Sequence, residues 1–181
     1  MGTEVLNLAE VEVYDIFGNN VALNAAATQS SVYSGSPSHD FVPSRAVNGI
    51  KSDDDFMHTN EEQGMMTSLK QVVTNINSQL NSTSSSLTYV FLSAGAWLQI
   101  DFEGDYQVGE VIIYNRNSGS YWHGWNRLSN SKVSLIKDDI VQAEYYIDDA
   151  SNLSVLSIAA SEFVSNLLCS WFEYICFSIM S

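Results

Sequence analysis

Apolar and polar residues alternate along several short stretches of the chain, which is the pattern of half-buried β-strands. The segment 8–14 (LAEVEVY) alternates apolar with acidic residues, and 108–116 (VGEVIIYNR) is rich in β-branched residues. Stretches of the same kind lie at 21–34, 97–102, 132–136, 143–147 and 153–158. Turn residues separate these stretches, and no helices lie between most of them. The pattern predicts an all-β protein, an antiparallel β-sandwich or jelly roll.

One stretch departs from this pattern. Between residues 65 and 80, apolar side chains recur at helical spacing and predict an inserted amphipathic helix: Met65, Leu69, Val72, Val73, Ile76 and Leu80. A compact sandwich does not need so long an excursion between two strands. We therefore treat about 64–95 as an interruption of one domain that covers residues 21–160.

Charge narrows the choice of partners. The chain of 181 residues is long enough for a sizeable core, and its seven basic against 21 acidic residues give a net charge of −14. Binding of nucleic acid or of anionic membranes needs clustered Lys and Arg, so both are disfavoured. A cation site or a neutral ligand such as a sugar suits this balance. No stretch is long and apolar enough for a membrane span, and the first residues do not form a secretory signal.

The segment 47–59 (VNGIKSDDDFMHT) concentrates hard oxygen donors. Asn48, Ser52, Asp53, Asp54 and Asp55 fall within eight positions. Carboxylates this dense repel one another unless a cation lies among them, and Ca²⁺ takes six to eight such oxygens on irregular loops. The five residues are therefore candidate calcium ligands. The alternative is an acidic loop that water alone solvates.

Aromatic residues mark a second loop. Tyr121, Trp122 and Trp125 lie in a polar, glycine-bearing segment, 118–127 (SGSYWHGWNR). Exposed rings often mark a recognition surface, and an aromatic ring suits the apolar face of a sugar. The alternative is that one or two of these rings cap the core of the sandwich.

Motifs along the chain resemble those of the discoidin-like domains, which include the coagulation factor V/VIII type C domains and the F-type lectins (fucolectins). The similarity runs from about 21 to 157, is interrupted at 64–95, and is closest to the lectin branch. Six segments carry it in order: VALNAAATQSSVY, SRAVNG, DFMHT, WLQIDF, VIIYNR and RLSNSKVSL.

The resemblance implies a galactose-binding-like β-sandwich with a ligand site built from loops at one end. It implies sugar-binding roles for His58, Arg116 and Arg127, whose imidazole and guanidinium groups suit neighbouring hydroxyls. It also implies that a structural Ca²⁺ is held by the acidic loop, with Glu10 as a further ligand. Glu10 is included because LAEVEVY resembles the closing strand of the fucolectins.

Three parts of the chain depart from the family's order. Residues 1–14 are either the closing strand of a preceding repeat or a permuted strand of this domain. The interruption at 64–95 is either an inserted helix or the translation of an unspliced segment. Residues 161–181 form an atypical tail that matches nothing in the family.

The motif itself also departs from the family. Ser118 stands where the family has an aspartate after the first arginine, and Phe56 stands where it has a cysteine. The interval between the two arginines is longer than the motif allows. These differences put fucose specificity in doubt, and a related sugar is an alternative.

The expected function is calcium-dependent carbohydrate binding by a non-catalytic module, outside the cell or at its surface. Tandem repeats or an oligomer would supply avidity, because each site is expected to bind modestly. The rivals are an adhesion module that binds protein or phospholipid, and a sugar-binding appendage of a larger enzyme. His39 and Asp40 are neighbours, but no nucleophile motif accompanies them.

Overall fold

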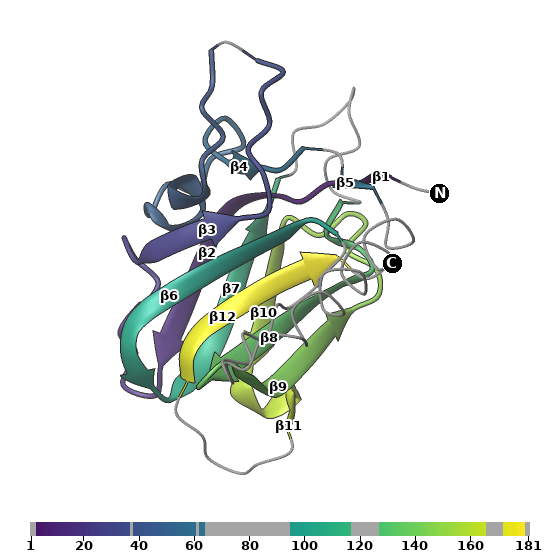
Figure 1. Ribbon diagram of the computed structural model, residues 1–181. Helices are drawn as coiled ribbons and strands as arrows, with labels where there is room; N and C mark the ends of the chain where they lie inside the picture. Colours follow the sequence, from purple (N-terminus) through teal and green to yellow (C-terminus); the bar gives the residue numbers. More distant parts are fainter. Residues whose placement is uncertain are drawn as a thin grey trace, which may run out of the picture.

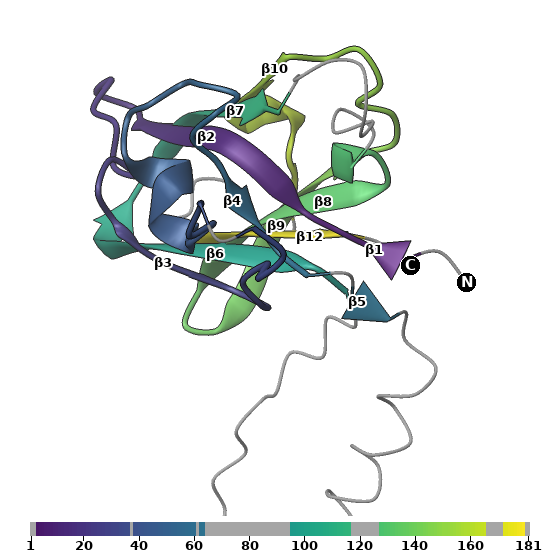
Figure 2. The same ribbon diagram turned by 90° about the horizontal axis from the view of Figure 1, so that it is seen from above.

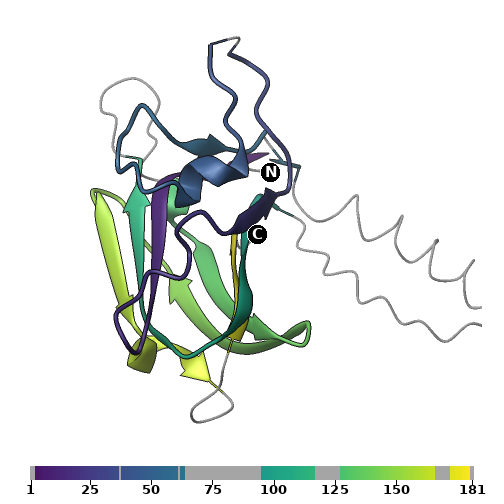
Figure 3. The same cartoon turned by 90° about the vertical axis from the view of Figure 1, so that its left-hand side faces the viewer.

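The computed structural model describes residues 3–36, 38–60, 62–63, 95–116, 127–165 and 172–179. These residues form two facing antiparallel sheets, which are seen from the side in Figure 3. The predicted β-sandwich is therefore confirmed. The expected helix near 65–80 lies outside the described residues.

The smaller sheet has the strand order β10-β7-β2-β4. It combines β2 (Asn7–Asp15), β4 (Met57–His58), β7 (Val108–Asn115) and β10 (Val155–Ala159). The strand β2 pairs with β7 on one side and with β4 on the other. The strand β2, which comes from near the start of the chain, thus lies between β7 and β4 of this sandwich (Figure 1).

The larger sheet has the order β11-β9-β8-β12-β6-β3. Its strands are β3 (Ala26–Gln29), β6 (Trp97–Tyr106), β8 (Ser131–Lys137), β9 (Ile140–Ile147), β11 (Val164–Ser165) and β12 (Phe172–Ile179). The strand β12 comes from the tail and pairs with both β6 and β8. Figure 2 shows β6 and β12 in one layer and β2 in the other.

Apolar side chains of the two sheets meet between the layers. Alternate residues of each strand point inward, so the sequence pattern of period two becomes a continuous core. The most deeply buried members come from both layers: Leu8, Val11, Val111, Ile113 and Ile158 from the smaller sheet, and Leu98, Ile100, Leu135, Ile175 and Phe177 from the larger.

The prediction that residues 8–14 are half-buried is wrong. In β2 even the acidic side chains Glu10 and Glu12 are buried. Their face of the strand lies beneath the loop that follows the short 3₁₀ helix η1 (Pro43–Val47). Gly49 of that loop donates its backbone N–H to Glu10, and Lys51 pairs with Glu12. The alternation of apolar and polar residues indicates which face of a strand is polar, but it does not indicate which other segments cover that face.

A pair of short strands also lies next to the loop end of the sandwich. The strands β1 (Thr3–Glu4) and β5 (Glu62–Gln63) pair with each other beside it. The 3₁₀ helix η3 (Ala160–Glu162) joins β10 to β11. In Figure 1, η1, β4 and the loops next to them stand above the sheets. No helix in the described part of the chain is long and apolar enough to cross a membrane.

Candidate functional site

His58 forms the centre of the loop end. It is the second residue of β4, where it pairs with Asn7 of β2, and its side chain is 8% exposed. Its Nδ1 lies 2.5 Å from the carbonyl oxygen of Thr59, and its Nε2 lies 2.8 Å from Nη1 of Arg127. A carbonyl only accepts and a guanidinium only donates. The imidazole therefore carries its proton on Nδ1 and accepts at Nε2.

The surroundings of His58 favour this neutral form. Burial, together with the smaller effect of the charges of Arg127 and Arg116, lowers the pKa of His58 to about 4, against the opposing hydrogen bond to Thr59. The ring is thus a fixed acceptor near neutral pH, because a protonated imidazole has no lone pair for Arg127.

Arg116 approaches the same place from the end of β7. Its guanidinium carbon lies 3.8 Å from the ring centroid of Phe56, which is a cation–π geometry. Its buried Nε has no hydrogen-bond partner among the described residues. Burial, and after it the charge of Arg127, lower the pKa of Arg116. The structure therefore brings together the three residues that the resemblance selected.

An aromatic cluster surrounds His58, and the sequence reasoning missed it. The ring centroids of Tyr33, Phe41 and Phe56 lie 4.6, 5.6 and 6.2 Å from that of His58. Phe41 has a left-handed backbone conformation, with φ of 45°, and its carbonyl accepts the N–H of His58. Strained non-glycine residues concentrate at functional sites. Both phenylalanines follow an aspartate within the segments that form this end, which is the one available sequence signal.

The acidic loop does not gather its carboxylates. Asp55 pairs with the guanidinium of Arg45 and accepts a hydrogen bond of 3.0 Å from Nδ2 of Asn48. Ser52 accepts the backbone N–H groups of Asp54 and Asp55 in a tight turn. In the described part of the chain, no three His, Cys, Asp or Glu side chains are placed to hold a metal ion together. The acidic ligand set expected from residue density is not assembled.

Glu10 is the one predicted ligand that lies buried beside this loop. Oε1 accepts the backbone N–H of Gly49 at 3.0 Å, and Gly49 adopts the φ of +82° that favours glycine. Oε2 is buried and has no hydrogen-bond partner among the described residues. Burial raises the pKa of Glu10 to about 7, against the opposing hydrogen bond from Gly49. An unpartnered buried carboxylate oxygen of this kind fits a cation.

Tyr121, Trp122 and Trp125 lie outside the described residues, so their expected contact with a ligand stays a prediction. Arg127 is described, and it lies in the turn just before the buried Leu128.

Similarity to solved structures concerns the fold. The chain is similar to the lectin domain of Lectinolysin complexed with Lewis B antigen, with 23% identity and a TM-score of 0.60 over 90% of this chain and 86% of that one. The chain is also similar to a fucose-binding module of Streptococcus pneumoniae, with 20% identity and a TM-score of 0.58 over 90% of this chain and 88% of that one. A third similar structure is the family 32 carbohydrate-binding module of C. perfringens NanJ in complex with galactose. Its identity is 11% and its TM-score 0.50, over 94% of this chain and 88% of that one. No protein-family model and no curated protein sequence matches the chain.

Proposed function

We propose that this chain is a non-catalytic carbohydrate-binding module for a fucose-type sugar, or a related one, and that it acts outside the cell or at its surface. One observation carries the proposal. His58, Arg116 and Arg127 come from three separate segments and converge at the loop end of a galactose-binding-like sandwich. The structural neighbours named above, which are described as binding Lewis b, fucose or galactose, support the same class of ligand.

The arrangement suits a neutral sugar because it offers rigid donors beside apolar rings. The guanidinium groups of Arg116 and Arg127 are planar forks that donate to adjacent hydroxyls or to a ring oxygen. His58 is almost enclosed, so we assign it a positioning role: its Nε2 accepts from Arg127 and fixes the direction of that guanidinium. The rings of Tyr33 and Phe56 supply the apolar wall that a methyl group or sugar face needs.

We also propose that Ca²⁺ binds at Glu10 and the Asn48–Asp55 loop. The support is the buried, unpartnered Oε2 of Glu10 next to the backbone of Asn48 and Gly49. Glu10, with the oxygens of Asn48 and Ser52, would hold the ion, which would supply positive charge to offset the burial of Glu10 and to hold the loop in place. Because the loop ends at His58, its order affects the position of the imidazole.

A glycan array probed with the full chain tests both proposals. We expect binding to fucose-bearing glycans or to glycans of a related sugar, and weaker binding after a chelator removes divalent ions. Binding that ignores the chelator would remove calcium from the account and leave sugar recognition intact.

Two further assays address the rival functions. Sedimentation with phospholipid vesicles tests lipid binding, and incubation with aryl-glycosides tests turnover. Vesicle binding without glycan binding, or turnover by the pure chain, would contradict the proposed function.

A further inference from the structure

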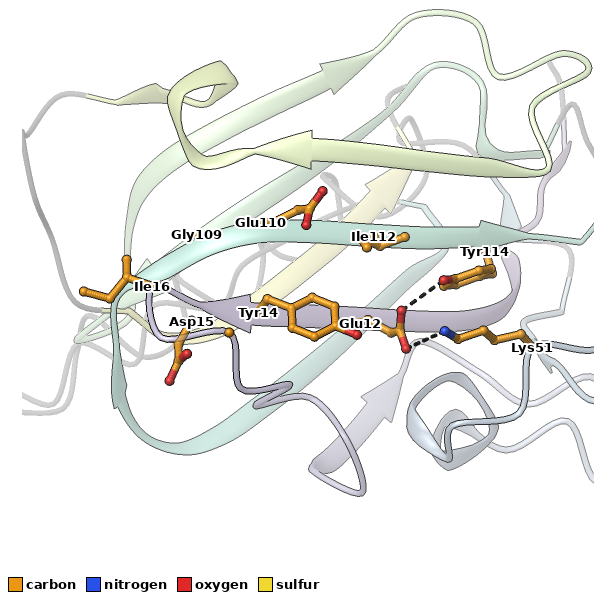
Figure 4. A pocket seen from close by; sticks show the side chains of 10 residues that line it. Glu12, Tyr14, Asp15, Ile16, Lys51, Gly109, Glu110, Ile112 and Tyr114 are labelled. Atoms are coloured by element: carbon orange, nitrogen blue, oxygen red, sulfur yellow. Dashed lines mark hydrogen bonds and ion pairs between the residues drawn. The ribbon is translucent and has the colours of Figure 1, made fainter.

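The outer face of the smaller sheet carries an open hollow, which borders the Asn48–Asp55 loop at Lys51. Its volume is about 510 Å³, and it lies across β2 and β7 (Figure 4). The lining combines carboxylates, aromatic rings and aliphatic side chains: Glu12, Tyr14, Asp15, Ile16, Glu110 and Tyr114 are among its members, with Lys51 at one end.

One end of the hollow already holds an ammonium group of this chain. Nζ of Lys51 lies 2.8 Å from Oε1 of Glu12 and 4.6 Å from the ring centroid of Tyr114. The hydroxyl of Tyr114 donates to Oε2 of Glu12 at 3.0 Å. A cation here is held by a carboxylate and a tyrosine ring together, which is a favourable combination.

Farther along the same face lie a second ring and a second carboxylate: Tyr14 is two residues after Glu12 on β2, and Glu110 lies beyond Ile112 on β7. Tyr14 of β2 is the direct cross-strand partner of Glu110 of β7, so the two side chains leave the same face a few ångströms apart. In Figure 4 the ring of Tyr14 is seen broadside from outside the sheet. Glu110 accepts from the hydroxyl of Ser157 at 2.6 Å, and in the described part of the chain no Lys or Arg forms an ion pair with it.

Charge and shape limit what fits beside Tyr14. After Lys51 offsets Glu12, the carboxylates of Asp15 and Glu110 leave the hollow negative in a chain of net charge −14. This repels anions and favours a cation. Ile112 lies between the two tyrosines, and Ile16, which is 55% exposed, borders the hollow. An aliphatic stem can rest on these side chains.

We propose that this hollow binds a lysine side chain of a partner polypeptide. The ammonium lies over the ring of Tyr14 with Glu110 as its counter-ion, as Lys51 lies over Tyr114 with Glu12. The methylene stem lies along Ile112. This surface is independent of the sugar site, so either proposal can fail alone.

A matched pair of ligands tests the proposal on the full chain. Backbone amide spectra are recorded during titration with Nα-acetyl-lysine methylamide and, separately, with the norleucine analogue, which keeps the stem and lacks the ammonium. We expect the lysine probe to shift the amides of Tyr14, Glu110 and Ile112, and the norleucine probe to leave them in place. Raising NaCl from about 0.05 M to about 0.5 M should weaken the lysine response through screening.

Two substitutions complete the test. Glu110→Gln keeps an acceptor for Ser157 and removes the charge, so it should leave the fold intact and weaken lysine binding about threefold or more. Asp148→Asn removes an equal charge from an exposed loop and should change nothing. The proposal would be overturned if the lysine and norleucine probes shifted these amide signals equally, or if Glu110→Gln and Asp148→Asn bound the lysine probe with equal affinity. It would also be overturned if free galactose or fucose shifted the same amide signals.

Discussion

At the scale of single residues, the imidazole of His58 explains why a histidine occupies the centre of the loop end. Its two nitrogens have different partners, one a carbonyl and one a guanidinium, and only the neutral ring satisfies both. A side chain without an acceptor at this position would remove the hydrogen bond that His58 accepts from Nη1 of Arg127. The role that we propose for His58 is therefore to fix the direction of the Arg127 guanidinium.

Replacing His58 by leucine should test that consequence. The loss of a hydrogen bond to a charged group costs about 1.5–3 kcal/mol, so sugar affinity should fall about tenfold or more. His58→Gln restores an acceptor and should recover part of the affinity. Titration calorimetry with both variants measures the difference, and equal affinities for leucine and glutamine would argue against a positioning role.

The pH dependence of binding follows from the same ring. The pKa of His58 is lowered from 6.5 to about 4, so the unfolded chain binds the proton more readily than the folded one. The associated stability is complete above pH 6.5 and is lost as the pH falls towards 4. Sugar affinity should stay level from about pH 8 to about pH 5 and decline below that. A midpoint near pH 6.5 in the binding curve would contradict this environment for His58.

Glu10 should have the opposite effect on the pH dependence of stability. Its pKa is raised from 4.5 to about 7, so the folded state holds the proton more tightly and stability is lost as the pH rises through this range. A bound cation would offset that loss. Thermal unfolding at about pH 8 should therefore rise by several degrees with Ca²⁺, and by much less at about pH 5.

Glu10→Gln isolates this effect. The amide keeps an acceptor for Gly49 and removes the charge, so without calcium the variant should unfold at a higher temperature than the wild type at about pH 8. It should also lose the response to calcium. Asp148→Asn serves as the control, and a calcium response that survives in Glu10→Gln would place the ion elsewhere.

At the scale of strands, β12 shows which elements the sequence could not predict. The region 167–180 is a nearly continuous apolar run, and such a run does not distinguish a strand from a buried helix. Its central position depends on partners far away in the chain, since Phe177 pairs with Leu98 of β6 and with Val133 of β8. By contrast, β7 to β10 carry alternation that local inspection could recognise.

Replacing a buried side chain of β12 by a smaller one should therefore lower the stability of the fold strongly. Phe177 is fully buried, and Phe177→Ala should lower the free energy of unfolding by about 3–5 kcal/mol. Val164→Ala on the edge strand β11, where the side chain is 71% exposed, should change it by less than about 0.5 kcal/mol. Denaturant unfolding of both variants measures the contrast. Similar small losses would mean that β12 is not a structural strand of the sandwich.

At the scale of the whole molecule, the order of the motifs along the chain predicted the sandwich and the convergence of three site residues. This was possible because the order of the strands places the loops that carry these residues at one end. The arrangement of the carboxylates in the acidic loop could not be predicted in this way. Density of acids in sequence predicted one shared cation, whereas Asp55 is neutralised by Arg45, a contact that depends on how η1 packs. The aromatic cluster around His58 was missed because Tyr33, Phe41 and Phe56 are separated in the sequence, and no local pattern shows that the chain brings their rings together.

The central claim is that Arg116 and Arg127 form one sugar site at the loop end. Calorimetric titration of the full chain with L-fucose, and with the best sugar on the array, tests it in the wild type and in Arg116→Met, Arg127→Met and Lys132→Met. We expect saturable binding that each arginine substitution weakens about tenfold or more. The Lys132→Met variant should bind as the wild type does, because Lys132 lies on the larger sheet and pairs with Glu144. The same affinity in all four proteins would show that Arg116 and Arg127 do not form the sugar site.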